Sequence, residues 1–154
     1  MSRSRLPYHS LSPAASQAMA AAGPILDDSP IGKQLVHLIY LRVSQINGCA
    51  FCVDKHARDL IKEGEDFQRI NSLVTWRETD FYSPRERAAL AWTEAATRLE
   101  GGEVPEAVFL ALKEVFSDRE IADIGFATAL MNAWNRMAIG FHQPVARAAF
   151  PAAQ

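Results

Sequence analysis

The stretch from Ile31 to His56, IGKQLVHLIYLRVSQINGCAFCVDKH, decides the fold of this chain. Between Ile31 and Ile46, apolar residues occupy nearly every angular position of a helix and do not alternate as they would in a strand. Asn47-Gly48 closes this helix, because glycine readily adopts the left-handed conformation that follows many helix ends. A second helix is predicted to begin around Cys49. The stretch therefore predicts two consecutive helices separated by one short turn.

Helix start and stop signals continue through the rest of the chain. Two capping boxes, Ser83 to Glu86 and Ser117 to Glu120, each pair a serine with a glutamate three residues later. Gly23-Pro24 is expected to stop a helix that begins at Ser12-Pro13. No segment alternates apolar and polar residues over the length of a strand. The predicted helices span residues 13–22, 31–46, 49–63, 66–73, 84–99, 105–116 and 118–140, with a connection over 74–82.

These signals predict an all-α protein, a bundle of about six to seven helices. A chain of 154 residues has the size of one domain, so a single domain is expected over residues 1–154, with loose ends at about 1–10 and 150–154. The composition, 49% apolar and 22% charged, is typical of soluble globular proteins. A net charge of -2 and the lack of a Lys/Arg run argue against a nucleic-acid partner.

The sequence predicts neither export nor membrane insertion. The N-terminal residues MSRSRLPYHSLSP contain two arginines but no apolar core, so they are not expected to form a secretory signal. The stretch from Ile124 to Asn135 is too short and too polar to span a bilayer. We therefore expect a cytoplasmic protein with no membrane partner.

The helices predicted over 31–46 and 118–140 are more apolar than ordinary surface helices. Apolar residues surround the first helix and cover a wide arc of the second. A helix that is apolar on all sides is buried, and a chain of this size has a limited interior. We therefore predict a homo-oligomer in which other copies of the chain cover part of this surface. The alternative is a central helix wrapped by its own neighbours.

Cys49, Cys52 and His56 are spaced three and four residues apart, so their side chains are predicted to share one helix face. The chain has only these two cysteines, and such a pair in a cytosolic protein indicates redox chemistry or metal binding rather than a structural disulfide. A helix N-terminus favours the thiolate, which is the reactive form. His56 can accept the thiol proton, and a second cysteine can trap an oxidised sulfur as a disulfide. The pattern predicts a redox-active dithiol.

Two other interpretations fit the same residues. A Cys2His2 metal site would consist of the cysteine pair, His56 and either His37 or His142. Zinc sites of that kind usually space their ligand pairs farther apart and fold around the metal, whereas this chain has its own core. The second interpretation is a pair of buried thiols beside a capping histidine. For the spacing reason given above, we expect no metal. We also expect no cofactor, since the nucleotide-binding motifs GxGxxG and GxxxxGK[ST] are absent from the sequence.

The segment from Leu41 to Cys52, LRVSQINGCAFC, with the following His56, resembles the alkylhydroperoxidase AhpD-like, carboxymuconolactone decarboxylase superfamily. Segments similar to its peroxidase-like branch are Trp76-Arg77-Glu78, Ser83 to Leu90 and Asn132 to Arg136. The resemblance covers most of the chain. It implies an all-α, AhpD-like fold assembled into dimers, often as trimers of dimers. Because the decarboxylases of the superfamily generally lack the cysteine pair, the peroxidase-like branch is favoured.

The resemblance also implies a role for each residue of the site. Cys52 would be the peroxide-reactive sulfur, Cys49 its resolving partner and His56 a proton relay. In the better-known peroxidases of the family, a glutamate stands twelve residues before the first cysteine, where this chain has His37. A histidine that commonly precedes the second cysteine is replaced by Phe51. His37 cannot supply the negative charge but can accept a proton, so we expect a dithiol that cycles at a low peroxidase rate.

The expected function is therefore that of a thiol-dependent alkyl hydroperoxidase. Its predicted partners are an organic hydroperoxide and a dithiol reductant, such as a thioredoxin-like or lipoyl protein. The sequence leaves open thiol–disulfide exchange by the same dithiol, and a non-catalytic metal-binding or structural helical oligomer. It also leaves open whether His37 acts in the relay or is a histidine bonded to a backbone carbonyl. Outside this site, Glu94 is predicted to be one half of an ordinary i,i+4 ion pair.

Overall fold

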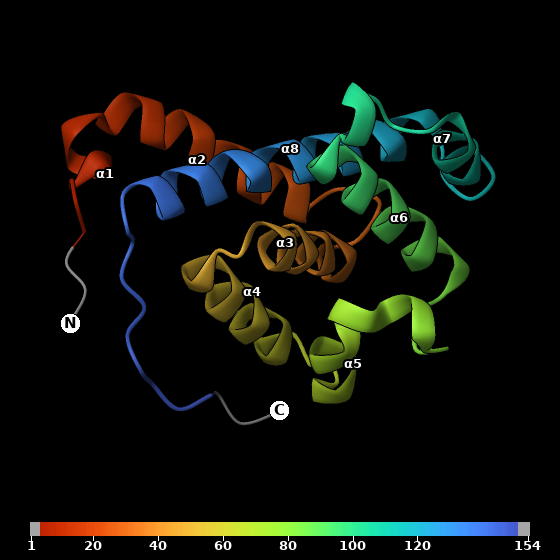
Figure 1. Cartoon of the computed structure of the whole chain (residues 1–154), viewed down its shortest axis with the longest axis horizontal. Coiled ribbons are helices and arrows are strands. Elements are labelled where there is room, and N and C mark those ends of the chain that lie inside the picture. The colour runs from red at the N-terminus through yellow and green to blue at the C-terminus, as the bar shows by residue number, and fades with distance from the viewer. Residues whose placement is uncertain (1–3, 151–154) are drawn as a thin grey trace.

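The computed structural model describes residues 4–150, and over this range it contains helices and no strand, which confirms the all-α prediction. Within these described residues, eight α-helices and two 3-10 helices follow one another, and Figure 1 shows their arrangement. They are α1 (Tyr8–Leu11), α2 (Pro13–Asp27), α3 (Lys33–Asn47), α4 (Ala50–Lys62), α5 (Phe67–Ser72), η1 (Leu73–Glu78), α6 (Pro84–Arg98), η2 (Glu100–Gly102), α7 (Glu106–Lys113) and α8 (Asp118–Gly140).

Helix α3 lies in the middle of the bundle (Figure 1). Every residue from Leu35 to Ser44 is buried, because α4, α6 and α8 pack around this helix. Its apolar circumference is thus explained by neighbours from the same chain, and the oligomer prediction is not needed for it. Helix α8 differs, since Phe126 and Ile139 remain exposed on its outer face.

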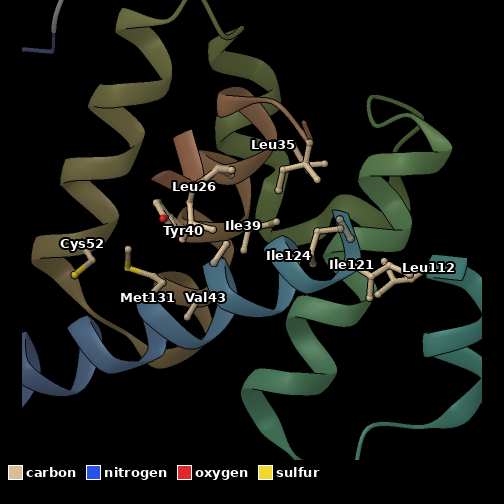
Figure 2. Close-up of a cluster of buried hydrophobic side chains, with 14 of the residues drawn as sticks. Leu26, Leu35, Ile39, Tyr40, Val43, Cys52, Leu112, Ile121, Ile124 and Met131 are labelled. Atoms are coloured by element: carbon tan, nitrogen blue, oxygen red, sulfur yellow. The ribbon is translucent and has the colours of Figure 1, made fainter. Parts of the chain in front are cut away.

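The core side chains of α3 and α8 bring the cysteine pair into the interior. Ile39 and Val43 of α3 belong to one buried cluster with Ile124 and Met131 of α8 (Figure 2). Cys49 and Cys52 are members of the same cluster. Cys52 is drawn at the edge of this cluster, beside Met131 (Figure 2). The pair is therefore held by core packing and not by a surface loop.

The turn between α3 and α4 fixes where the two sulfurs sit. Gly48 has a left-handed backbone, with φ of 69°, and the Cys49 N–H donates to the carbonyl of Ser44 at 3.0 Å. Such a turn suits glycine, as predicted. Cys49 is the extended N-cap residue of α4, and the first helical residue is Ala50. Both cysteines consequently lie within the first turn of α4, at its electropositive end.

The expected stop at Gly23-Pro24 is wrong, because α2 continues through both residues to Asp27. A proline inside a helix removes the hydrogen bond to the carbonyl four residues earlier, which here belongs to Ala20. Ala20, Gly23 and Pro24 all border one cavity, so the interrupted turn faces open space instead of packed core. The connection expected over 74–82 also differs, since its first part forms the 3-10 helix η1.

The predicted loose ends are partly wrong as well. Tyr8 is buried in the short helix α1, and the Arg5 N–H donates to the Phe141 carbonyl at the end of α8 at 2.8 Å. At the other end, the Phe150 ring lies 4.5 Å from the guanidinium of Arg58 on α4. These contacts order the flanks against the bundle. Residues 1–3 and 151–154, also predicted to be loose, lie outside the described residues.

Glu94 forms the predicted i,i+4 ion pair with Arg98, but it is also buried among residues from other elements that lie closer to its carboxylate. Its Oε1 accepts hydrogen bonds from Arg42 Nε at 2.7 Å and from Trp76 Nε1 at 3.0 Å. Arg77 donates to Oε2, whereas the i,i+4 partner Arg98 stands 3.7 Å away. The carboxylate therefore joins α3, η1 and α6 in a polar network.

Candidate active site

A cavity of about 440 Å³ lies against the first turns of α4. Cys52 and His56 of α4 line it together with His37 and Tyr40 of α3. Its remaining walls are mainly apolar and come from α1, α2 and α8, through residues that include Tyr8, Pro24, Leu130, Met131, Trp134 and Ala138. Three of the four predicted site residues thus meet at one cavity. The fourth, Cys49, is buried beside Cys52 and is not among the lining residues.

The two thiols are free and interact with each other. The hydrogen bond from Cys52 lowers the pKa of Cys49 to about 7, and the backbone N–H groups of Phe51 and Cys52 add to this effect against the opposing effect of burial. The same hydrogen bond and burial raise the pKa of Cys52. The pair therefore loses one proton near neutral pH and holds the other.

This coupling predicts an unusual thiolate titration. The ultraviolet thiolate absorbance of the reduced protein should rise by one thiolate per chain, with a midpoint near pH 7. The second thiol should stay protonated through the range around 8.5 where a free cysteine titrates. Cys52→Ala should move the first midpoint upward, because Cys49 then loses its hydrogen-bond donor. Two thiolates appearing together near pH 8.5 would contradict a shared proton.

His56 is positioned to accept a proton. Its side chain is buried, and Nδ1 lies 3.5 Å from Asp59 Oδ2 one turn further along α4. Burial lowers the pKa of His56, and the neighbouring Asp59 only partly opposes this effect. A lowered pKa leaves the imidazole neutral at pH 7, the form that can take up a proton.

Two carboxylates that the sequence analysis missed flank His37. Its Nε2 lies 3.3 Å from Asp27 Oδ1, and its Nδ1 lies 3.1 Å from Glu63 Oε1. The His37 ring is 5.8 Å from the His56 ring, measured between centroids. Negative charge is therefore present at this end of the site, although His37 itself cannot provide it. Glu63 caps the C-terminus of α4, two helical turns after His56, and this spacing was the available signal.

The Asn132 to Arg136 segment contributes a buried amide on the other side of the thiols. Asn135 is fully buried, and its Nδ2 donates to Ser44 Oγ at 3.1 Å. A hydrogen bond from Asn135 also acts to lower the pKa of Cys52. Asn47, just before the turn, donates to Asn135 Oδ1 at 3.0 Å. This amide therefore ties the cysteine turn to α8.

The Cys2His2 interpretation requires the cysteine pair, His56 and a second histidine to converge on one point. Across residues 4–150, no group of three or more His, Cys, Asp or Glu side chains is arranged to hold a metal ion. His37, considered as one ligand of such a set, lies within ion-pair distance of Asp27 and Glu63. The same range contains no helix long and apolar enough to cross a membrane.

Residues 12–95 match the model of the carboxymuconolactone decarboxylase family, which is more than half of the chain. The chain belongs to this family. A curated relative, the uncharacterized protein YdfG of Bacillus subtilis (strain 168), is 37% identical to this chain over 135 residues, which cover 88% of this chain and 92% of YdfG.

Solved structures of similar proteins share the fold. A protein of unknown function from Agrobacterium tumefaciens, described as a candidate antioxidant defence protein AhpD, superposes with a TM-score of 0.88 and 40% identity. The match covers 94% of this chain and 100% of that one. A peroxidase-related protein from Ralstonia eutropha JMP134, described as an alkylhydroperoxidase AhpD core, gives a TM-score of 0.78 at 26% identity, covering 89% of this chain and 73% of its own. These matches confirm the predicted resemblance to the AhpD-like, carboxymuconolactone decarboxylase superfamily and its fold.

Proposed function

We propose that this protein is a thiol-dependent peroxidase that reduces organic hydroperoxides with the Cys49/Cys52 pair. The observation that carries the proposal is the placement of Cys52 on the wall of a largely apolar cavity, with Cys49 hydrogen-bonded behind it and a buried His56 beside it. An apolar cavity accepts the organic group of a hydroperoxide, and the sulfur end receives its peroxide oxygens.

The chemistry uses one thiolate shared by the pair. The proton of Cys52 moves to Cys49 along their hydrogen bond, and the Cys52 thiolate attacks the terminal peroxide oxygen. The S–O bond forms, the O–O bond breaks, and the alkoxide takes up a proton and leaves as the alcohol. Cys49 then gives its proton to His56 and attacks the sulfenic sulfur of Cys52, which releases hydroxide and leaves a disulfide.

Family membership supports an antioxidant role of this kind. The Agrobacterium and Ralstonia proteins carry descriptions that name AhpD, and the second is peroxidase-related. We expected a low peroxidase rate because His37 and Phe51 replace the glutamate and histidine of the better-known peroxidases. The carboxylates of Asp27 and Glu63 lessen this expected loss, because they place negative charge beside the His37–His56 pair. We therefore favour peroxide reduction over thiol–disulfide exchange as the function of this dithiol.

The partners complete this proposal. A dithiol protein, thioredoxin-like or lipoyl-bearing, would reduce the disulfide, and the cytoplasm would keep the pair reduced.

We also propose a homo-oligomer. Ile25 of α2 and Phe126 of α8 are exposed large apolar side chains, and both line a second, largely apolar pocket between these helices. Light scattering on the purified protein measures this assembly directly, and a monomer at working concentration would exclude it.

The experiment that tests the function uses fully reduced protein and one equivalent of cumene hydroperoxide. Remaining thiols are alkylated without reduction, and intact mass is measured. Loss of both thiols as a Cys49–Cys52 disulfide, with release of the alcohol, is the expected result. Two thiols that stay free would overturn the peroxidase, and oxidation by a model disulfide alone would favour thiol–disulfide exchange.

A further inference from the structure

Tyr40 is a cavity residue whose hydroxyl has no structural partner. It is buried on α3, one turn after His37, and its ring lies 5.1 Å from the His56 ring between centroids. The Tyr40 oxygen is directed toward α4, on the side of the core where Cys52 lies (Figure 2). Within residues 4–150, no side chain or backbone group hydrogen-bonds to this hydroxyl. A buried hydroxyl without a partner costs free energy, so a purely structural tyrosine is poorly explained.

Tyr82 shows what a structural tyrosine looks like in the same chain. It is as deeply buried as Tyr40, at 4% exposure, but its hydroxyl donates to the Arg69 carbonyl at 2.5 Å. Tyr82 lies outside the residues that line the cavity. Of these two tyrosines, Tyr40 alone lines the cavity with Cys52 and His56, and its buried hydroxyl alone has no hydrogen-bond partner.

We propose that Tyr40 is a catalytic residue that donates its O–H proton to the leaving oxygen of the hydroperoxide. This inference rests on the proposed function and adds the acid that its first step requires. An alkoxide is a poor leaving group without a proton, and a positioned acid typically speeds such a step about 10²- to 10⁴-fold. Burial and the nearby Asp27 raise the pKa of Tyr40, so the hydroxyl is protonated and available as a donor throughout neutral pH.

The proton cycle closes within the site. When Cys52 attacks, the O–O electron pair goes to the alkyl oxygen, which takes the Tyr40 proton and leaves as the alcohol. The Tyr40 phenolate then regains a proton from the thiol of Cys49 through His56. Cys49, now a thiolate, attacks the sulfenic sulfur of Cys52 and displaces hydroxide. The sum is one thiolate, one thiol and one hydroperoxide converted to a disulfide, an alcohol and hydroxide.

The test compares two oxidants whose leaving groups differ. Cumene hydroperoxide releases an alkoxide that needs a proton, whereas peracetic acid releases a carboxylate that needs none near neutral pH. Tyr40→Phe keeps the ring and removes the hydroxyl. Its rate of thiol oxidation with cumene hydroperoxide should fall about 100-fold, while its rate with peracetic acid stays unchanged. Tyr82→Phe is the matched control and should leave both rates unchanged.

The possible outcomes separate the two proposals. Equal slowing with both oxidants would overturn the acid role and make Tyr40 a residue that shapes the thiol pair. No slowing with either oxidant would also overturn it, with the peroxidase intact. Failure of the wild type itself to consume cumene hydroperoxide would instead reject the proposed function. The unfolding midpoint of Tyr40→Phe should be unchanged or higher, since the variant loses an unpartnered buried hydroxyl.

Discussion

Cys52→Ser should abolish the consumption of cumene hydroperoxide, with a loss of at least about 10³-fold, because a serine hydroxyl remains protonated and cannot replace a thiolate nucleophile. Cys52 lines the cavity, whereas Cys49 is buried and is not among the lining residues, so Cys52 is the thiol that a peroxide bound there would meet. The measurement is single-turnover loss of hydroperoxide by the reduced variant, with intact mass recorded afterwards.

Cys49→Ser is the matched variant and should give a different result. Cys52 still attacks, but no resolving thiol follows, so one equivalent is consumed and the protein gains the mass of one oxygen atom. The lowered pKa of Cys49 offers a competing assignment, in which Cys49 is the nucleophile. If Cys52→Ser consumed one equivalent and Cys49 carried the oxygen, the roles would be reversed and access through the cavity would not control reactivity.

The helices and their ends followed from local sequence. Both capping boxes form as predicted, with the serine side chains of Ser83 and Ser117 accepting from the third residue of each helix. Gly48 adopts the left-handed conformation at the helix end where the sequence placed it. These features depend on contacts within four residues, which sequence spacing describes directly. The same reasoning failed at Pro24, where the deciding fact is a cavity built by distant elements.

Residue spacing alone predicted the candidate site only along α4, and His37 of α3 was added by the family resemblance. Spacing on α4 placed Cys52 and His56 together, and both line the cavity. Spacing could not reveal that Asp27 from α2 contacts His37, because that contact depends on how α2 packs against α3. Tyr40 was missed for a related reason, since an aromatic residue in an apolar helix ordinarily indicates core packing. Contacts between residues of different helices can be predicted only once the fold is known.

Glu94→Gln should lower the free energy of unfolding by about 3–5 kcal/mol, because it leaves the buried guanidinium of Arg42 without its counter-charge. Arg42 Nη2 lies 2.5 Å from Glu94 Oε1, and both side chains are almost completely buried. Arg42 follows Tyr40 by two residues, about 200° around α3, so the pair anchors the face of α3 opposite the cavity. Urea denaturation at pH 7 measures the loss.

The exposed partner provides the control for this carboxylate. Arg98→Gln should cost less than about 1 kcal/mol, since Arg98 is largely solvated and stands 3.7 Å from Glu94.

Burial opposes ionisation, but hydrogen bonds from Trp76, Arg77 and Arg42 hold the pKa of Glu94 below its usual range. The Glu94 carboxylate therefore stabilises the fold fully above the pKa of about 4.3 that a glutamate has in the unfolded chain. This stabilisation is lost as the pH falls through the lower pKa of Glu94 in the folded protein. The difference between wild type and Glu94→Gln should therefore shrink in acid, and a difference that stayed constant down to acid pH would show that lost shape, not lost charge, destabilises the variant.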